Sequence, residues 1–420
     1  MDTKKIKSFP TRLPFYYGWI NLAIAALAMV ATLPARTFGL GLITEPLLHN
    51  LAIDRVFYGK MNFWATMIGS TFALVCGPAV DRFGVRTIST SVLFCLGVTV
   101  LVFSSVTGAA MLIVLLILVR GFGQSALSAV SLTIVGKWFV QRLSKAMGIF
   151  SVIIGIGFVA AIVIVETSVL QTGWRNTWFM IGWSLIAVSV LGWLLVRRSP
   201  ESCGLEPDQA INREDETPDK NTMPGFSLSG ALKTMAFWVF AIGSALYNLI
   251  IAGVLLFNQS ILQELGFDEI VFRNAMAGFV LVGLAGNLLA GWLAQKWSLG
   301  KLMAVAMISL TLCLATYPIL DKEWKVILHA MMLGLSGGVV TVVFFTSFGK
   351  LFGRPHLGKI QGVAQVLAVL ASACGPWLLA EVYTRTGSYN PAFFGFVPVV
   401  VVISILALVM RIPKPESAKS

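Results

Sequence analysis

The chain has 420 residues, of which 57% are hydrophobic and 12% are charged, and its mean hydropathy is +0.84. Soluble domains carry about 25% charged residues, so the composition excludes a soluble globular protein and indicates an integral membrane protein. The formal net charge of +12 is explained better by orientation in a membrane than by a nucleic-acid partner, and no nucleic-acid partner is expected.

The N-terminal segment combines Lys4, Lys5 and Lys7 with a following uncharged apolar run over residues 17–35. This arrangement resembles a secretory signal peptide. The run is longer than the apolar region of a cleaved signal, which spans about 7–15 residues. We therefore expect a retained first membrane span.

Twelve apolar stretches fill most of the chain, and each has about the 20 residues that a spanning helix needs. Backbone polar groups inside a bilayer must bond within their own helix, so an all-α integral membrane protein is predicted. The weakest separation is Thr107-Gly108, between the third and fourth spans. The expected spans are residues 17–37, 60–80, 87–106, 109–136, 145–167, 176–196, 232–258, 273–295, 301–320, 325–349, 359–382 and 390–411.

A polar, proline-containing stretch over residues 197–230 separates the sixth span from the seventh. Its composition is typical of a linker. The predicted organisation is an N-terminal six-helix bundle (1–196), a cytoplasmic linker (197–230) and a C-terminal six-helix bundle (231–420).

The basic residues predict the orientation, because Lys and Arg concentrate in cytoplasmic loops. With both termini inside, the inner loops and tails hold 22 of the 31 basic residues, the outer loops and span ends hold 8, and Arg120 lies inside a span. We therefore expect a multi-pass protein of the cell inner (plasma) membrane with both termini cytoplasmic. The lipid bilayer is then its first partner, and a monomer is expected.

The two halves of the chain repeat. Residues 214 positions apart often match, and a second set lies 213 positions apart, which a one-residue insertion in the second inner loop reconciles. This repetition predicts two pseudo-symmetric six-helix bundles around a midplane site. The matching pairs are Gly77/Gly291, Gly123/Gly337, Lys145/Lys359, Gly148/Gly362, Thr172/Thr386, Gly173/Gly387, Asn176/Asn390, Phe179/Phe393, Gly136/Gly349, Lys137/Lys350 and Phe139/Phe352.

The loop after the second span has the sequence GPAVDRFGVR at residues 77–86. Gly84 suits a tight turn, Arg82 and Arg86 suit the inner lipid face, and Asp81 could form a polar latch between the halves. An ordinary basic inner loop is the alternative. The loop resembles the signature loop of the major facilitator superfamily, G-x-x-x-D-R-x-G-R-R, which implies the major facilitator fold. In the second-half copy, Gln295 replaces the acid.

Within that superfamily, several segments resemble the monocarboxylate-transporter and oxalate:formate-antiporter branch. They are FYYGW at residues 15–19, WFVQRLSKAMG at 138–148, and RSPE followed by GLEPD at 198–208. The resemblance implies an antiporter or symporter of small organic anions.

An arginine inside the membrane indicates a functional or structural role, because its insertion at a span centre costs about 2.5–3.5 kcal/mol of free energy on insertion scales. Arg36 lies late in the first span, in a patch similar to the one where the branch keeps a cation for the substrate carboxylate. A guanidinium can bind a carboxylate bidentately. The alternative is that Arg36 extends to the outer interface.

Arg120 lies in the middle of the fourth span between small residues, Gly121 and Gly123, and resembles the superfamily's arginine there. Its alternative role is structural. No Asp or Glu lies near the middle of any expected span. The fixed charge at depth is therefore positive, which favours an anion over a cation.

The chain departs from the branch in the eighth span, where an acid and an arginine are expected. Those places hold Gly283 and Asn287 here. A coupling proton therefore has no evident carrier, and Asn287 could bind substrate or only a neighbouring helix. In the eleventh span, where the oxalate antiporters keep a cation, the polar residues here are Gln361 and Gln365. Other polar residues in spans could line a cavity or bond a neighbouring helix: Tyr247, Asn248, Asn258, Gln259, Gln124, Ser128, Thr341 and His329.

Together these features predict a secondary active transporter that moves a small organic anion, a monocarboxylate, by alternating access. The expected substrate-binding residues are Arg36, Arg120, Asn287, Tyr247 and Asn248, and the expected gating residues are Asp81, Arg82, Gly84 and Arg86. The alternatives are an exporter or facilitator of a neutral or amphipathic solute, a non-transporting membrane sensor, and a membrane enzyme. No cofactor, metal site or catalytic residue is expected.

Overall fold

The computed structural model describes residues 14–206, 208 and 225–410, and these residues form helices without a strand. Eleven helices are long and apolar enough to cross a membrane, and a shorter apolar helix precedes them. The prediction of an all-α, multi-span membrane protein is confirmed. Parts of the predicted linker and both chain ends lie outside the described residues.

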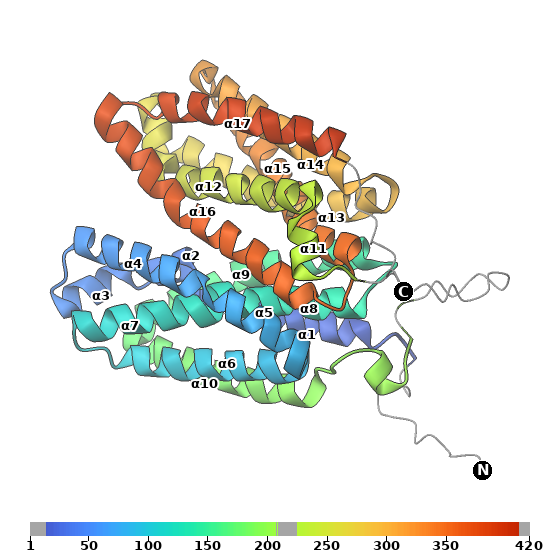
Figure 1. Ribbon diagram of the computed structural model, residues 1–420. Coiled ribbons are helices and arrows are strands. Elements are labelled where there is room, and N and C mark those ends of the chain that lie inside the picture. The colour runs from blue at the N-terminus through green and yellow to red at the C-terminus, as the bar shows by residue number, and fades with distance from the viewer. Residues whose placement is uncertain (1–13, 207, 209–224, 411–420) are drawn as a thin grey trace, which may run out of the picture.

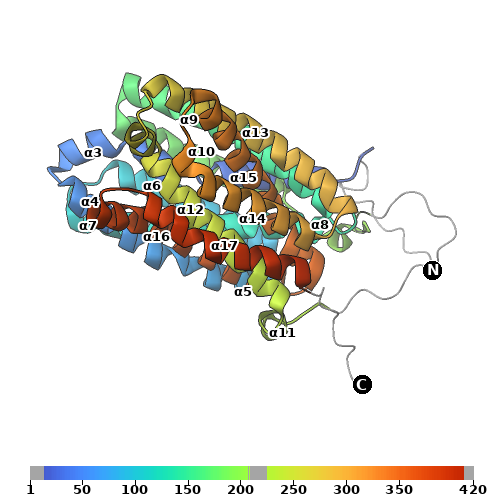
Figure 2. The same ribbon diagram turned by 90° about the horizontal axis from the view of Figure 1, so that it is seen from above.

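Figure 1 shows two groups of helices, which overlap in the view of Figure 2. The first group contains α1 (Gly18–Val30), η2 (Leu33–Ala35), α2 (Thr37–Gly41), α3 (Thr44–Leu51), α4 (Arg55–Ser70), α5 (Phe72–Phe83), α6 (Val85–Ser104), α7 (Ala109–Val119), η3 (Arg120–Leu127), α8 (Ser128–Trp138), α9 (Leu143–Thr172) and α10 (Trp174–Leu195). After the short η4 (Glu201–Cys203) and α11 (Leu228–Leu232), the second contains α12 (Met235–Glu264), α13 (Glu269–Lys296), α14 (Leu299–Thr316), η5 (Tyr317–Ile319), α15 (Glu323–Phe352), α16 (Leu357–Thr386) and α17 (Asn390–Val409).

The two bundles meet mainly where α5 packs on α16 and α9 packs on α13. Towards the other end of these helices, α16 and α17 diverge from α4 and α7 (Figure 1). Large apolar side chains such as Val75, Leu170 and Trp64 are exposed on the outside of the molecule. Exposed apolar surface of this extent fits contact with lipid.

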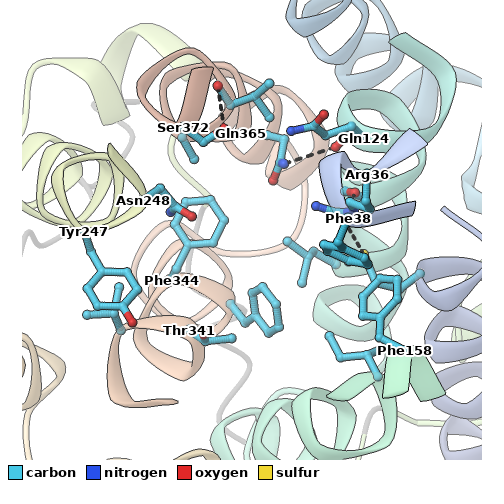
Figure 3. A pocket seen from close by; sticks show the side chains of 18 residues that line it. Arg36, Phe38, Gln124, Phe158, Tyr247, Asn248, Thr341, Phe344, Gln365 and Ser372 are labelled. Carbon is cyan, nitrogen blue, oxygen red and sulfur yellow. Dashed lines mark hydrogen bonds between the residues drawn. The ribbon is translucent and has the colours of Figure 1, made fainter. Parts of the chain in front are cut away.

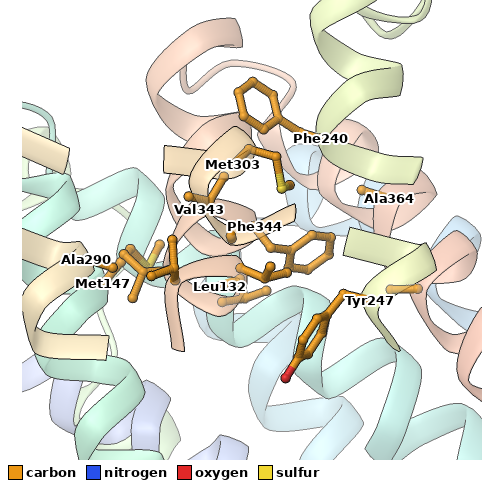
Figure 4. Packing of buried hydrophobic residues seen from close by; sticks show 14 of the residues in the cluster. Leu132, Met147, Phe240, Tyr247, Ala290, Met303, Val343, Phe344 and Ala364 are labelled. Atoms are coloured by element: carbon orange, nitrogen blue, oxygen red, sulfur yellow. The ribbon is translucent and has the colours of Figure 1, made fainter. Parts of the chain in front are cut away.

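One apolar cluster includes side chains from both bundles. Figure 4 shows Leu132 and Met147 of the first bundle near Ala290, Val343 and Phe344 of the second. The bundles therefore share a core over part of their length, instead of only touching at their surfaces.

The first predicted span, residues 17–37, is not one helix. α1 ends at Val30 after 13 residues, about 20 Å at 1.5 Å per residue, which is less than the apolar thickness of a bilayer. The Thr32 hydroxyl then donates to the Met29 carbonyl at 2.7 Å, and Pro34, which has no N–H to donate, lies in the 3₁₀ turn η2. The break leaves Arg36 with extended backbone between η2 and α2.

The fourth predicted span, residues 109–136, contains a π-helical segment, η3, between α7 and α8. The glycines let η3 approach its neighbours closely, because a Cβ on Gly123 would collide with the Cβ of Ala35. The Ser128 hydroxyl lies 3.4 Å from the Gly123 carbonyl, to which it donates within the wider turn. Wide turns of this kind frequently occur at functional sites.

Candidate functional site

A cavity of about 260 Å³ lies between the two bundles, with walls from both. Figure 3 shows Arg36, Phe38, Gln124 and Phe158 on one side and Tyr247, Asn248, Thr341 and Phe344 on the other. The lining residues are Met29, Arg36, Phe38, Gln124, Ser128, Leu132, Ile154, Phe158, Tyr247, Asn248, Val340, Thr341, Phe344, Phe345, Gln365, Ala368, Val369 and Ser372.

Arg36 supplies the positive charge of this wall. Its Nε donates to Thr32 Oγ1 at 3.0 Å, and its Nη2 donates to Ser128 Oγ at 2.8 Å and to the sulfur of Met29 at 3.4 Å. The guanidinium also lies 5.7 Å from the centre of the Phe158 ring. Within the described part of the chain, its Nη1 has no hydrogen-bond acceptor, so it remains available to a ligand.

The lining contains no Asp or Glu, whereas amide and hydroxyl groups supply the remaining polarity. No carboxylate among the described residues pairs with Arg36. An unpaired guanidinium in a partly apolar cavity attracts an anion and repels a cation. Charge and lining therefore suit one acidic group with an apolar or neutral polar remainder.

Arg120 is 3% exposed and does not line the cavity. Its Nη1 donates to the Ala35 carbonyl at 3.0 Å, to Thr37 Oγ1 at 3.2 Å and to Gln124 Oε1 at 2.7 Å. Its Nε and Nη2 donate to Asn62 Oδ1 at 3.3 and 2.8 Å. Protein acceptors enclose this guanidinium, so the geometry supports the structural alternative over direct substrate contact.

Two of the other predicted substrate-binding residues line the cavity, and one does not. The Tyr247 hydroxyl donates to the Leu333 carbonyl at 3.4 Å, and the Asn248 amide donates to the Ser244 carbonyl at 2.8 Å, with both side chains in the lining. Asn287 is buried on α13 outside the lining, in the region where Gly148 of α9 and Gly338 of α15 approach it. Its Oδ1 has no hydrogen-bond partner among the described residues.

Five further polar residues line the cavity, and none of them was among the expected substrate-binding residues. They come from η3, α8, α15 and α16: Gln124, Ser128, Thr341, Gln365 and Ser372. The spacing of these residues could have indicated a shared helix face. Gln124 and Ser128 lie four residues apart, and Gln365 and Ser372 lie seven apart, in otherwise apolar spans.

Asp81, at the end of α5, contacts the second bundle. Its Oδ1 accepts from Lys137 Nζ at 3.1 Å and from the Gly358 amide at 3.2 Å, and its Oδ2 accepts from the Lys359 amide at 3.0 Å. The carboxylate thus lies at the N-terminus of α16, where helix amides favour an anion. Next to it α5 and α16 touch, and a Cβ on Gly77 would collide with the Gly358 carbonyl.

The other predicted gating residues stay within the first bundle. Gly84 has φ = 90°, in the region that favours glycine, and it ends α5 and begins α6. Arg86 Nε donates to the Trp193 carbonyl of α10 at 2.8 Å, with its guanidinium 4.4 Å from the centre of the Trp193 ring. The guanidinium of Arg82 lies 5.2 Å from the centre of the Phe83 ring.

The repeat-related contact between α9 and α13 lacks this acidic group. Gln295 donates from Nε2 to the Gly291 carbonyl of its own helix at 3.3 Å. Lys350 Nζ and Ser144 Oγ both donate to the Ala294 carbonyl, at 3.0 and 3.4 Å. Gly148 and Gly291 face each other here, so the helix backbones lie close together.

The described start of the linker makes two further contacts on this side. Asp208 accepts from the amides of Val140, Gln141 and Arg142, just before α9, at 2.6–3.2 Å. Glu201 pairs with Arg354 of the second bundle through two hydrogen bonds of 2.8 and 3.2 Å. Burial alone would raise the pKa of the Glu201 carboxyl, but hydrogen bonds from Arg354 and Ser199 outweigh it and hold the pKa below its usual value.

The sequence profile of the Major Facilitator Superfamily matches residues 19–320 and residues 235–420, and the chain belongs to this family. It is therefore a multi-pass membrane transporter. Human monocarboxylate transporter 2 is 21% identical over 383 residues, which cover 85% of this chain and 79% of the relative. Bovine monocarboxylate transporter 13 is 23% identical, covering 79% and 75% of the two chains.

Solved structures support the same fold. The human organic anion transporter MFSD10 (TETRAN) superimposes with a TM-score of 0.69 at 15% identity, over 94% of this chain and all of the other. The transporter FucP in its outward conformation gives a TM-score of 0.69 at 13% identity, over 93% and 99% of the two chains. The predicted major facilitator fold is confirmed.

Proposed function

We propose that this transporter moves a small organic anion, a monocarboxylate, by alternating access. The observation that carries the proposal is Arg36, whose guanidinium faces an inter-bundle cavity without a carboxylate partner among the described residues. Its free Nη1 would donate to the substrate carboxylate, and Tyr247 and Asn248 would contact the remainder from the opposite wall. The distant monocarboxylate-transporter relatives agree with this substrate class.

The two-bundle organisation, with domains at 1–196 and 231–420 and the linker between them, gives the proposed mechanism. With both termini cytoplasmic in an inner (plasma) membrane, the side of Asp81 faces the cytoplasm. The structure then represents an outward-facing state in which α5–α16 and α9–α13 close the inner side. Breaking the contacts of Asp81 would accompany the opening of this side.

The test is Arg36→Ala in proteoliposomes, with counterflow of labelled acetate, lactate, pyruvate and benzoate at two pH values. We expect transport to be abolished while membrane expression stays intact, because Arg36 is the one cation among the described lining residues. Arg36→Lys is the matched control that keeps the charge but not the bidentate geometry, and it should retain partial transport. Full transport by Arg36→Ala would remove Arg36 from the site.

An exporter or facilitator of a neutral or amphipathic solute is the second candidate. The aromatic side chains in the lining, Phe38, Phe158, Phe344 and Phe345, together with the enclosed Arg120, favour it. Counterflow by an uncharged aromatic solute, with none by any carboxylate in the panel, would establish this alternative.

A further inference from the structure

Gln124 has a side-chain orientation that its neighbour Arg120 determines. Arg120 Nη1 lies 2.7 Å from Gln124 Oε1. A guanidinium has only hydrogen-bond donors, so the amide oxygen of Gln124 must face Arg120, and the amide NH₂ must point the other way. Gln124 lines the cavity, and in the described part of the chain no group accepts from this NH₂.

Arg120 is itself fixed in place. Its acceptors come from three separate elements: Asn62 of α4, Ala35 of η2 and Thr37 of α2. Leaving this position for the cavity would break these bonds and strand a buried charge, which is strongly unfavourable. Arg120 therefore acts on the cavity through the residues that it bonds. These are Gln124, which lines the cavity, and Ala35 and Thr37, which flank Arg36.

The Gln124 amide and Arg36 belong to the same wall (Figure 3). Arg36 Nη2 bonds Ser128, four residues after Gln124, and both residues line the cavity. The free Nη1 of Arg36 and the free NH₂ of Gln124 are thus two donors on one side of the cavity. An ionised carboxylate has two oxygens that only accept hydrogen bonds, so it matches two such donors.

We infer that Gln124 binds the substrate carboxylate beside Arg36, and that Arg120 is a positioning residue that holds the Gln124 amide with its donor toward the substrate. This inference rests on the proposed function and adds a specificity-determining residue to it. The backbone carbonyl of Gln124 also accepts from Gln365 Nε2 of the second bundle at 3.4 Å. The residue that receives the carboxylate is therefore also in contact with the opposite bundle.

The test measures KM and maximal rate in proteoliposomes for the carboxylate of the panel that gives the strongest counterflow. Gln124→Glu keeps the side-chain size and an acceptor for Arg120, but replaces the NH₂ donor with a carboxylate oxygen. We expect KM to rise at least tenfold, with the yield and melting temperature of the purified protein unchanged. Gln124→Leu, which removes the donor without adding charge, should raise KM about fivefold to tenfold. A KM within twofold of the parent for both variants would overturn the inference.

The positioning role is tested by combining variants. Arg120→Lys alone should raise KM, and in the Gln124→Leu background it should raise KM by a clearly smaller factor, because the amide it orients is gone while its bonds beside Arg36 remain. Effects that multiply would overturn the positioning role. The Gln124 variants retain Arg120, so they decide the carboxylate contact even where Arg120→Lys does not reach the membrane. Loss of transport in Arg36→Ala together with normal KM in both Gln124 variants would reject this inference alone, whereas full transport in Arg36→Ala would reject the proposed function.

Discussion

The two main contacts between the bundles, α5 with α16 and α9 with α13, use the same backbone packing and different polar chemistry. Gly77 meets Gly358 in the first, and Gly148 meets Gly291 in the second. In the first, Asp81 bonds across the interface to two amides of α16. In the second, the corresponding residue is Gln295, which bonds its own helix.

An acidic side chain also lies at the start of α9, but it belongs to the linker and not to the opposite bundle. Asp208 of the linker accepts from three amides just before α9, whereas α16 receives Asp81 from the opposite bundle. Both helix starts gain the favourable charge at an N-terminus. Of these two acids, Asp81 is the one that joins the two bundles. One contact on this side is therefore held by charge and packing, and the other chiefly by packing.

Asp81→Asn is expected to have the largest effect on the contacts between the bundles. The volume is kept, but charge-assisted bonds are lost, and hydrogen bonds to charged groups contribute about 1.5–3 kcal/mol. A loss of about 2 kcal/mol would shift the open–closed equilibrium roughly 30-fold. Amide hydrogen exchange of Gly358 and Lys359 should accelerate accordingly.

The matched control for this measurement is Asp268→Asn. Asp268 also accepts from two helix amides, those of Ile270 and Val271, but within one bundle. It should leave the exchange of Gly358 and Lys359 unchanged. Equal exchange rates in Asp81→Asn and the parent would show that packing alone closes this interface.

Gln295→Asp should make the second contact resemble the first. The new carboxylate would lie on α13 near Lys350, whose ammonium now bonds only the Ala294 carbonyl in the described part of the chain. Lys350 belongs to the same bundle as α13, so the gain between the bundles comes from the N-terminus of α9, where Ser144 bonds Ala294. A gain of about 1 kcal/mol, the upper range for an exposed anion at a helix N-terminus, would slow transport roughly fivefold. Rates of counterflow measure this effect, and Gln295→Asn is the uncharged control. Equal rates for both variants would contradict a latch at this position.

Glu201→Gln should have the smallest effect, because the Glu201–Arg354 pair is partly exposed and such pairs contribute about 0.2–1 kcal/mol. The pKa of Glu201 is lowered, so the pair is fully present above the ordinary Glu pKa of about 4.3 and is lost as the pH falls through the lowered value. Spin-label distances between the bundles on this side should differ for parent and variant at pH 7, and should converge as the pH is lowered until the Glu201 carboxyl is protonated. A difference that stays constant throughout this acid titration would contradict this assignment.

The sequence predicted the parts of the fold that depend on length and local composition. Apolar stretches and the loop at residues 77–86 were sufficient for the helices and the family. The break in the first span had one visible sign, Pro34, but its position beside Arg36 depends on how η2 and α2 pack.

The cavity could be predicted only in part, because the rotation of each helix decides which polar side chains face inward. Arg36, Tyr247 and Asn248 line it, whereas Arg120 and Asn287 lie outside the lining. The sequence could not show that Arg120 is enclosed, since its acceptors come from distant positions such as Asn62 and the Ala35 carbonyl. Gln124 was visible as a polar residue, but its orientation became evident only from the bond to Arg120.

The π-helical segment η3 accounts for a one-residue difference in length between matching helices of the two halves. Thirteen positions separate Gly123 from Gly136, whereas twelve separate the matching Gly337 and Gly349 on α15, which is α-helical throughout. A turn closed over five residues instead of four absorbs one surplus residue without rotating the helix on either side. The extra residue is accommodated within Arg120–Leu127, next to the cavity. Gly136, further along the helix, therefore lies on the same helix face as its counterpart Gly349.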